Sequence, residues 1–238
     1  MIKVWDYLKE YQFLRNDILK IVDEVFKGGI LIFGPKLEKF EEKFSKYNNC
    51  KYGIGVGNGT DALYIALRAC EIGKGDEVIT VSNTAVPTVT AIVNAGADVR
   101  FVDIDKYYLI DVNKIEQAIT KKTKAIMPVH LFGQVCNMNK IMELANKYNL
   151  KVIEDCAQAH GATYYNKKAG SIGDIGCFSF YPTKIFGAYG DGGFITTNDK
   201  NLYDKMHRIR FLGMEKKKMS SGDWNGEYYA IEHGTNSR

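Results

Sequence analysis

Short apolar segments alternate along the chain with segments whose apolar residues recur at helical spacing. The short segments predict strands at residues 52–56, 78–81, 99–102, 125–129, 151–153, 177–180 and 193–196. Helical spacing predicts helices near residues 18–26, 37–47, 63–69, 87–95, 112–119, 138–148 and 201–211. Because a crossover helix makes consecutive strands run parallel, this order predicts an α/β fold with a mostly parallel sheet flanked by helices.

The same pattern divides the chain into three parts. Residues 1–35 form an N-terminal helical segment, and residues 36–212 hold the alternating strands and helices of one large domain. From residue 213 the periodicity disappears, which predicts a mobile loop in residues 213–238. Ligands of a parallel sheet bind beyond the carboxyl ends of its strands, so we expect functional side chains in the loops there.

Composition narrows the functional classes. The 238 residues include 32 basic and 28 acidic side chains, a net charge of +4, and these are interspersed rather than gathered in the basic stripe of a nucleic-acid-binding protein. No apolar run approaches the length of a membrane span, and the start lacks an apolar signal core, so we expect a cytoplasmic protein. The five cysteines are widely spaced, which favours buried thiols over disulfides or a metal site.

A glycine-rich turn, Gly57-Asn58-Gly59-Thr60, joins the first predicted strand to a helix. Glycines allow close backbone approach, and free N–H groups at a helix start attract phosphate, so Thr60 is a candidate for a phosphate oxygen. An ordinary tight turn is the alternative. The G-x-G-x-x-G spacing of a dinucleotide site is not met.

Two further strand ends carry reactive side chains. The strand at 151–153 leads into Glu154 and Asp155, and the strand at 177–180 is followed by Lys184, with Ser179 before it. Each has an alternative without catalysis: an exposed loop for the two acids, and a surface position for Lys184. A lysine that loses water becomes nucleophilic enough to form a Schiff base with an aldehyde. A phosphate cradle, a carboxylate and such a lysine are together the parts that hold pyridoxal phosphate.

These motifs resemble the DegT/DnrJ/EryC1/StrS family of pyridoxal-phosphate-dependent sugar aminotransferases. The resemblance runs from about residue 29 to the last residue. Its most specific pieces are the segments 57–63, 73–80, 154–162 and 179–184 with the glycine tail at 190–193. It implies the large domain of a fold-type I aminotransferase, with the small C-terminal domain only begun in residues 213–238 and otherwise absent from this chain.

The resemblance also implies roles for individual residues. Lys184 would form the internal aldimine and move the proton, and Asp155 would pair with the pyridine nitrogen. The phosphate would be held by the turn that contains Gly59, by Thr60, by Asp61 through its backbone, and by Ser179. Gln158 would lie near the phenolic oxygen of the cofactor. Asn236 matches an asparagine that reaches the phosphate of the other subunit, which implies a homodimer with the active site at the subunit interface.

The implied reaction transfers an amino group from glutamate to a nucleotide-linked keto-deoxy-sugar by a 1,3-proton shift. Two alternatives stay open: a dehydratase of the same fold, in which histidine typically replaces the lysine, and a truncated remnant without catalysis. The chain departs from the family at Ala85, where an aromatic residue often stacks on the cofactor ring.

Overall fold

The computed structural model describes residues 5–215 and 229–238. The chain divides into two compact units, residues 1–40 and residues 41–238. The predicted loop at 213–238 falls partly on residues 216–228, which lie outside the described residues.

The first unit contains helix α1 (Tyr7–Gly28), which ends where Gly29 adopts a left-handed conformation with φ of 71°. This conformation costs glycine little because it has no Cβ atom. Helix α2 (Pro35–Tyr47) begins at a proline, which suits the first turn of a helix, and continues into the second unit. Among the helices of residues 5–215, none is long and apolar enough to cross a membrane.

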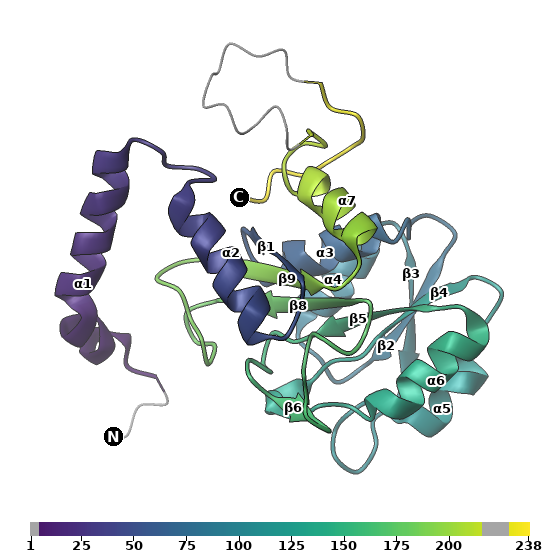
Figure 1. The fold of residues 1–238 in the computed structure, drawn as a ribbon. Helices are drawn as coiled ribbons and strands as arrows, with labels where there is room; N and C mark the ends of the chain where they lie inside the picture. Colours follow the sequence, from purple (N-terminus) through teal and green to yellow (C-terminus); the bar gives the residue numbers. More distant parts are fainter. Residues whose placement is uncertain (1–4, 216–228) are drawn as a thin grey trace. The chain divides into compact units, whose positions relative to one another are not determined.

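The second unit is built on a seven-stranded sheet in the order β1-β9-β8-β5-β4-β2-β3 (Figure 1). The strands are β1 (Tyr52–Val56), β2 (Glu77–Val81), β3 (Asp98–Val102), β4 (Thr123–Met127), β5 (Lys151–Asp155), β8 (Ile175–Ser179) and β9 (Gly193–Thr197). Neighbouring strands from β3 to β8 pair in parallel, whereas β9 pairs antiparallel with both β8 and β1. Strand β9 therefore runs against the others, and the sheet is mostly parallel as predicted.

Helices cover both faces of this sheet. They are α3 (Gly59–Ala69), α4 (Val86–Asn94), α5 (Val112–Ala118), α6 (Met138–Tyr148) and α7 (Lys200–Arg210). Residues of α3, α4 and α7 share one buried cluster with Val78 and Ile153, and residues of α5 and α6 share another with Ile79 and Val152. Adjacent strand residues thus point to opposite cores, so these strands read as continuous apolar runs.

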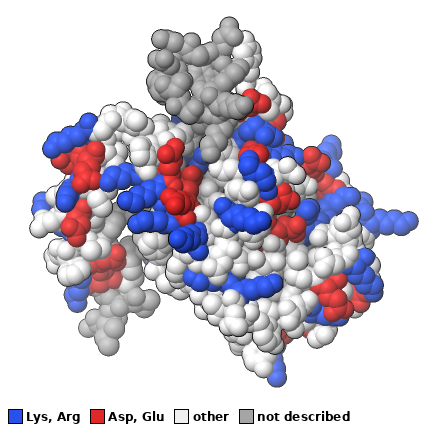
Figure 2. Space-filling view, in the orientation of Figure 1, with Lys and Arg blue, Asp and Glu red and all other residues white. Residues whose placement is uncertain are grey.

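Aromatic side chains fill the second face near β8 and β9. Phe44 of α2 packs with its ring centroid 5.3 Å from that of Phe178 and 4.8 Å from that of Phe194. A short hairpin of β6 (Thr163–Tyr164) and β7 (Lys167–Lys168) lies outside the main sheet. Basic and acidic side chains are interspersed on the face shown in Figure 2. All five cysteines are free, and four of them are buried.

Candidate active site

A cavity of about 490 Å³ lies at the edge of the sheet where most of its strands end. Loops after β1, β2, β5 and β8 line it, because these strands run in the same direction and their carboxyl ends meet there. Six residues predicted from the sequence line this cavity: Gly59, Thr60, Asp61, Asp155, Ser179 and Lys184. The structure therefore brings the glycine turn, the carboxylate and the lysine to one place.

The glycine turn forms the start of α3. Asn58 caps the helix, its Oδ1 accepting a hydrogen bond of 2.8 Å from the N–H of Asp61. The amides of Gly59 and Thr60 come first in the helix and have no partner among the described residues, so they can bind an anion. A Cβ atom at Gly59 would lie 2.7 Å from the Cβ of Ser179, so the serine and the turn are in close contact.

The carboxylate of Asp155 lies at the end of β5 and is only 5% exposed. Its Oδ2 accepts a hydrogen bond of 2.8 Å from the Thr88 hydroxyl, and its Oδ1 accepts one of 3.1 Å from the Ala157 N–H. Burial raises the pKa of Asp155, and these hydrogen bonds and the charge of Lys184 only partly oppose it. A cationic hydrogen-bond donor in the cavity would stabilise the ionised carboxylate.

Lys184 lies in the loop that joins β8 to β9. The Lys184 N–H donates to the carbonyl of Tyr181 at 2.8 Å, and the Ala188 N–H donates to the carbonyl of Phe180 at 2.7 Å, which folds the loop back on itself. Gly187 is required at this fold because a Cβ atom there would lie 2.4 Å from the carbonyl oxygen of Pro182. The half-buried Lys184 side chain makes no ion pair within the described residues, so its amine is available to a ligand.

Two predicted residues do not line the cavity. Gln158 uses its Oε1 to accept a hydrogen bond of 2.8 Å from the N–H of Phe132, a residue held at a φ of 54°. Asn236 is exposed and pairs with Phe211 in an isolated β-bridge. Asp61 does line the cavity, but its N–H is already bonded to Asn58. A phosphate bound at that amide would share the Asp61 N–H with Asn58 Oδ1.

Thr88 is a cavity residue that the sequence analysis did not single out. It lies in the first turn of α4, which follows β2, and its hydroxyl is 2.7 Å from that of Thr84. The position of Thr88, at the start of a helix that follows a strand, could have marked it as a candidate. The neighbouring sequence does not indicate that its hydroxyl reaches Asp155. Ala85, the residue that departs from the family, also lines the cavity, next to Pro87.

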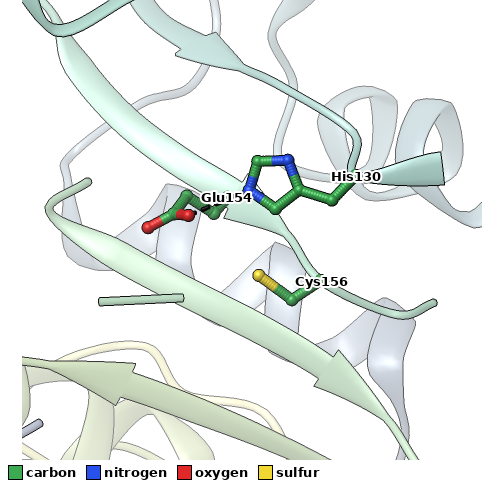
Figure 3. Close-up of side chains that lie close together, drawn as sticks. All are labelled: His130, Glu154 and Cys156. Atoms are coloured by element: carbon green, nitrogen blue, oxygen red, sulfur yellow. Dashed lines mark hydrogen bonds and ion pairs between the residues drawn. The ribbon is translucent and has the colours of Figure 1, made fainter. Parts of the chain in front are cut away.

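Behind Asp155, the buried side chains of His130, Glu154 and Cys156 lie close together, with His130 and Glu154 joined by a hydrogen bond (Figure 3). The Glu154 carboxylate accepts 2.9 Å bonds from His130 Nε2 and the Gly170 N–H. It also accepts bonds of 2.8 and 2.7 Å from the N–H groups of residues 172 and 173. Burial would raise the pKa of Glu154, but these hydrogen bonds lower it below its ordinary value. With its oxygens thus occupied, Glu154 ties the loop at 170–173 to the sheet.

A sequence model described as the DegT/DnrJ/EryC1/StrS aminotransferase family matches residues 12–238. A dTDP-3-amino-3,4,6-trideoxy-alpha-D-glucose transaminase of Micromonospora megalomicea subsp. nigra is 50% identical over 90% of this chain and 57% of its own length. The crystal structure of S. venezuelae DesV with a ketimine intermediate superposes with a TM-score of 0.92 at 36% identity, covering 100% of this chain and 62% of that one. Bacillus subtilis NtdA with bound cofactor PMP gives a TM-score of 0.84 at 39% identity, covering 94% and 49%. The chain thus spans about half to three fifths of the length of these proteins.

Proposed function

The chain belongs to the DegT/DnrJ/EryC1/StrS aminotransferase family, and on this premise we propose that it is the cofactor-binding part of a sugar aminotransferase. The reaction moves an amino group from glutamate to a keto-deoxy-sugar carried on a nucleotide. Relatives that are named transaminases of dTDP-linked and UDP-linked sugars support this substrate class. The observation that carries the proposal is that Lys184, Asp155 and the start of α3 line one cavity.

The residues of the cavity fit pyridoxal phosphate, which the family and its PMP-bound structure imply. The amides of Gly59 and Thr60, which have no partner in the part of the chain that the structure describes, would hold the phosphate together with the Asp61 amide and the Ser179 hydroxyl. Asp155, whose buried carboxylate forms no ion pair within residues 5–215 and 229–238, would accept a hydrogen bond from the protonated ring nitrogen. The Lys184 amine would bind the aldehyde carbon.

When bound, the cofactor supplies a carbonyl that condenses with amines and a ring that accepts electrons from the substrate carbon. Asp155 would keep the proton on the ring nitrogen, and the Thr88 hydroxyl and the Ala157 N–H fix the orientation of its carboxylate. Lys184 Nζ, once free of the aldehyde, would be the group that holds and moves the proton during amino transfer. Since Lys184 occupies the place where a dehydratase typically has histidine, the residues favour amino transfer over dehydration.

The proposal includes a homodimer. Asn236 is exposed, as a residue that reaches the phosphate of a second subunit must be. Val86 at the start of α4, Phe132 after β4 and Ile185 after β8 are strongly exposed apolar side chains at the same edge of the sheet as the cavity. A second copy that covers these side chains would close the cavity. We propose Gln158 for the phenolic oxygen, using the amide nitrogen that its bond to Phe132 leaves available.

We also propose the domain division expected from the sequence. Residues 36–212 would form the cofactor-binding domain, preceded by a helical segment at 1–35 and followed at 213–238 by the start of a small domain.

Borohydride reduction in the presence of pyridoxal phosphate, followed by peptide mapping, tests the role of Lys184. We expect the pyridoxyl group on the peptide that contains Lys184, together with a visible absorption band that Lys184→Ala abolishes. Lys114→Ala, which removes a partly exposed lysine of α5, is the matched control and should leave the band unchanged. An unmodified Lys184 peptide would refute the assignment.

A second assay tests the reaction itself. Purified chain is incubated with glutamate and a panel of nucleotide-linked keto-sugars, and formation of 2-oxoglutarate and of the amino-sugar is followed. Cofactor binding at Lys184 without any transfer would favour the non-catalytic alternative. Loss of water from the sugar without amino transfer would favour the dehydratase.

A further inference from the structure

The last residues of the chain lie against the glycine turn of the cavity. The N–H of Thr235 donates to the carbonyl of Ile209 at 2.7 Å, and the N–H of Ser237 donates to the carbonyl of Arg210 at 2.9 Å. The N–H of Leu212 donates in turn to the carbonyl of Thr235 at 2.9 Å. These bonds fasten the segment 235–237 to the end of α7.

Side chains in this segment alternate, as in a strand. Asn236 is exposed, whereas Ser237 is only 1% exposed and points inward. The Ser237 hydroxyl donates a hydrogen bond of 2.6 Å to Oδ2 of Asp61 and accepts one of 2.9 Å from the N–H of Gly57. It therefore joins the two sides of the turn that contains Gly59 and Thr60.

The position of the Asp61 carboxylate matters for any anion in the cavity. Asp61 lies in the first turn of α3, where a carboxylate is attracted to the unpartnered N–H groups at the helix start. A ligand phosphate would need the same N–H groups, and it would be repelled by a carboxylate beside them. The bond to Ser237 holds the Asp61 carboxylate beside Gly57 instead, since a Cβ atom at Gly57 would lie 3.5 Å from its Oδ2.

We propose that Ser237 is a positioning residue for the phosphate end of the cofactor. Its hydroxyl holds the Asp61 carboxylate away from the amides of Gly59 and Thr60 and fixes the entry to the turn through Gly57, so the site is open to a dianion. This inference rests on the proposed function, because it concerns the phosphate of the same cofactor. Ser237 itself does not contact the reacting atoms.

The experiment compares pyridoxal phosphate with pyridoxal, which has the same aldehyde and ring but no phosphate. Apparent affinities are measured from the visible band that forms with Lys184, for the wild type, Ser237→Ala, Asp61→Asn and the double variant. A hydrogen bond to a charged acceptor is lost in Ser237→Ala, so we expect about tenfold weaker binding of pyridoxal phosphate. Binding of pyridoxal should not change, which also shows that the variant is folded.

The double variant isolates the charge. Once Asp61 is replaced by asparagine, no carboxylate is left to compete with the phosphate, so we expect the double variant to recover most of the affinity that Ser237→Ala loses. Ser171→Ala is the matched control, because it removes a hydroxyl bonded to the Lys168 carbonyl and does not line the cavity. It should leave both affinities unchanged.

The results separate this inference from the proposed function. If Ser237→Ala leaves the affinity for pyridoxal phosphate unchanged, or weakens both ligands equally, the positioning role is overturned. If the double variant binds no better than Ser237→Ala, the role of the Asp61 charge is overturned. If the wild type itself shows no preference for pyridoxal phosphate over pyridoxal, the proposed function fails, and the inference fails with it.

Discussion

Replacing Glu154 with glutamine tests whether the buried carboxylate behind the cavity holds the fold together. The carboxylate accepts four hydrogen bonds, from His130 and from the N–H groups of Gly170, Ile172 and Gly173. Glutamine has almost the same shape, but one of its terminal atoms is a donor. Whichever way the amide is turned, its NH₂ group faces two donors and loses both bonds.

The size of the effect follows from burial. Glu154 is fully buried, so the donors left without an acceptor cannot turn to water. Breaking a buried charged pair costs about 3–5 kcal/mol. This is a large part of the roughly 5–15 kcal/mol by which a typical domain is stable. We therefore expect Glu154→Gln to lower the free energy of unfolding by about 3 kcal/mol or more.

Glu116→Gln is the matched control. It makes the same chemical change at a partly exposed glutamate that accepts a 2.6 Å bond from Lys147. Such surface pairs contribute about 0–1 kcal/mol, so we expect almost no effect. Urea unfolding followed by circular dichroism gives both values. Equal losses in the two variants would refute the view that burial of the Glu154 network determines its contribution.

The pH dependence of stability provides a second test of the Glu154 carboxylate. The pKa of Glu154 is lower in the folded chain than its ordinary value, so the folded state binds this proton less readily than the unfolded state does. The resulting stabilisation is complete above the ordinary carboxyl pKa and is lost as the pH falls through the lowered value. Unfolding free energies measured between neutral and acidic pH should therefore fall more steeply in the wild type than in Glu154→Gln. Parallel curves would contradict this assignment.

Three further substitutions have defined outcomes. Asp155→Asn should raise the melting temperature of the cofactor-free chain at neutral pH, because burial raises the pKa of this carboxyl and its ionisation opposes folding; a lower melting temperature would contradict this. The same variant should slow the proposed amino transfer by about 10²–10³-fold. Gly193→Ala would place a Cβ atom 2.3 Å from the carbonyl oxygen of Asn58, so we expect the free energy of unfolding in urea to fall by about 1–3 kcal/mol and cofactor binding to weaken. Wild-type values for both would show that the turn can shift freely. Arg210→Met removes a buried guanidinium that donates to Glu41 at 2.6 Å, and we expect the free energy of unfolding in urea to fall by about 3 kcal/mol. An unchanged value would show that apolar packing can replace the pair.

Much of the fold was predictable because the strands of a sheet covered on both faces are continuous apolar runs. The predicted strand at 52–56 and the predicted helix at 138–148 have the bounds that the structure shows. The hairpin of β6 and β7 was missed, since its sequence, Thr163 to Lys168, is polar and has no apolar alternation. Helix α1 begins at Tyr7, well before the predicted start, and the signal for it was overlooked: Tyr7, Leu8, Tyr11 and Leu14 already recur at helical spacing.

The cavity residues that could be predicted from the sequence are those at the ends of strands. Thr60, Asp155 and Lys184 each lie at or after the carboxyl end of a strand, and the ends of strands that run in the same direction meet at one edge of the sheet. Ser237 left no such signal. Its hydroxyl bonds to a side chain 176 residues earlier in the chain, and only the folded structure brings the two together.

The antiparallel pairing of β1 with β9 has a consequence for the order in which the chain assembles. Tyr52 is paired with Thr197, so the first strand has no neighbour in the sheet until the last one has been placed. Closing so long a stretch of chain is slow, whereas the strands at the centre pair over shorter separations. Binding of a vitamin B6 compound would then report that folding has gone to completion, and a kinetic trace of its colour during refolding would follow the final docking event.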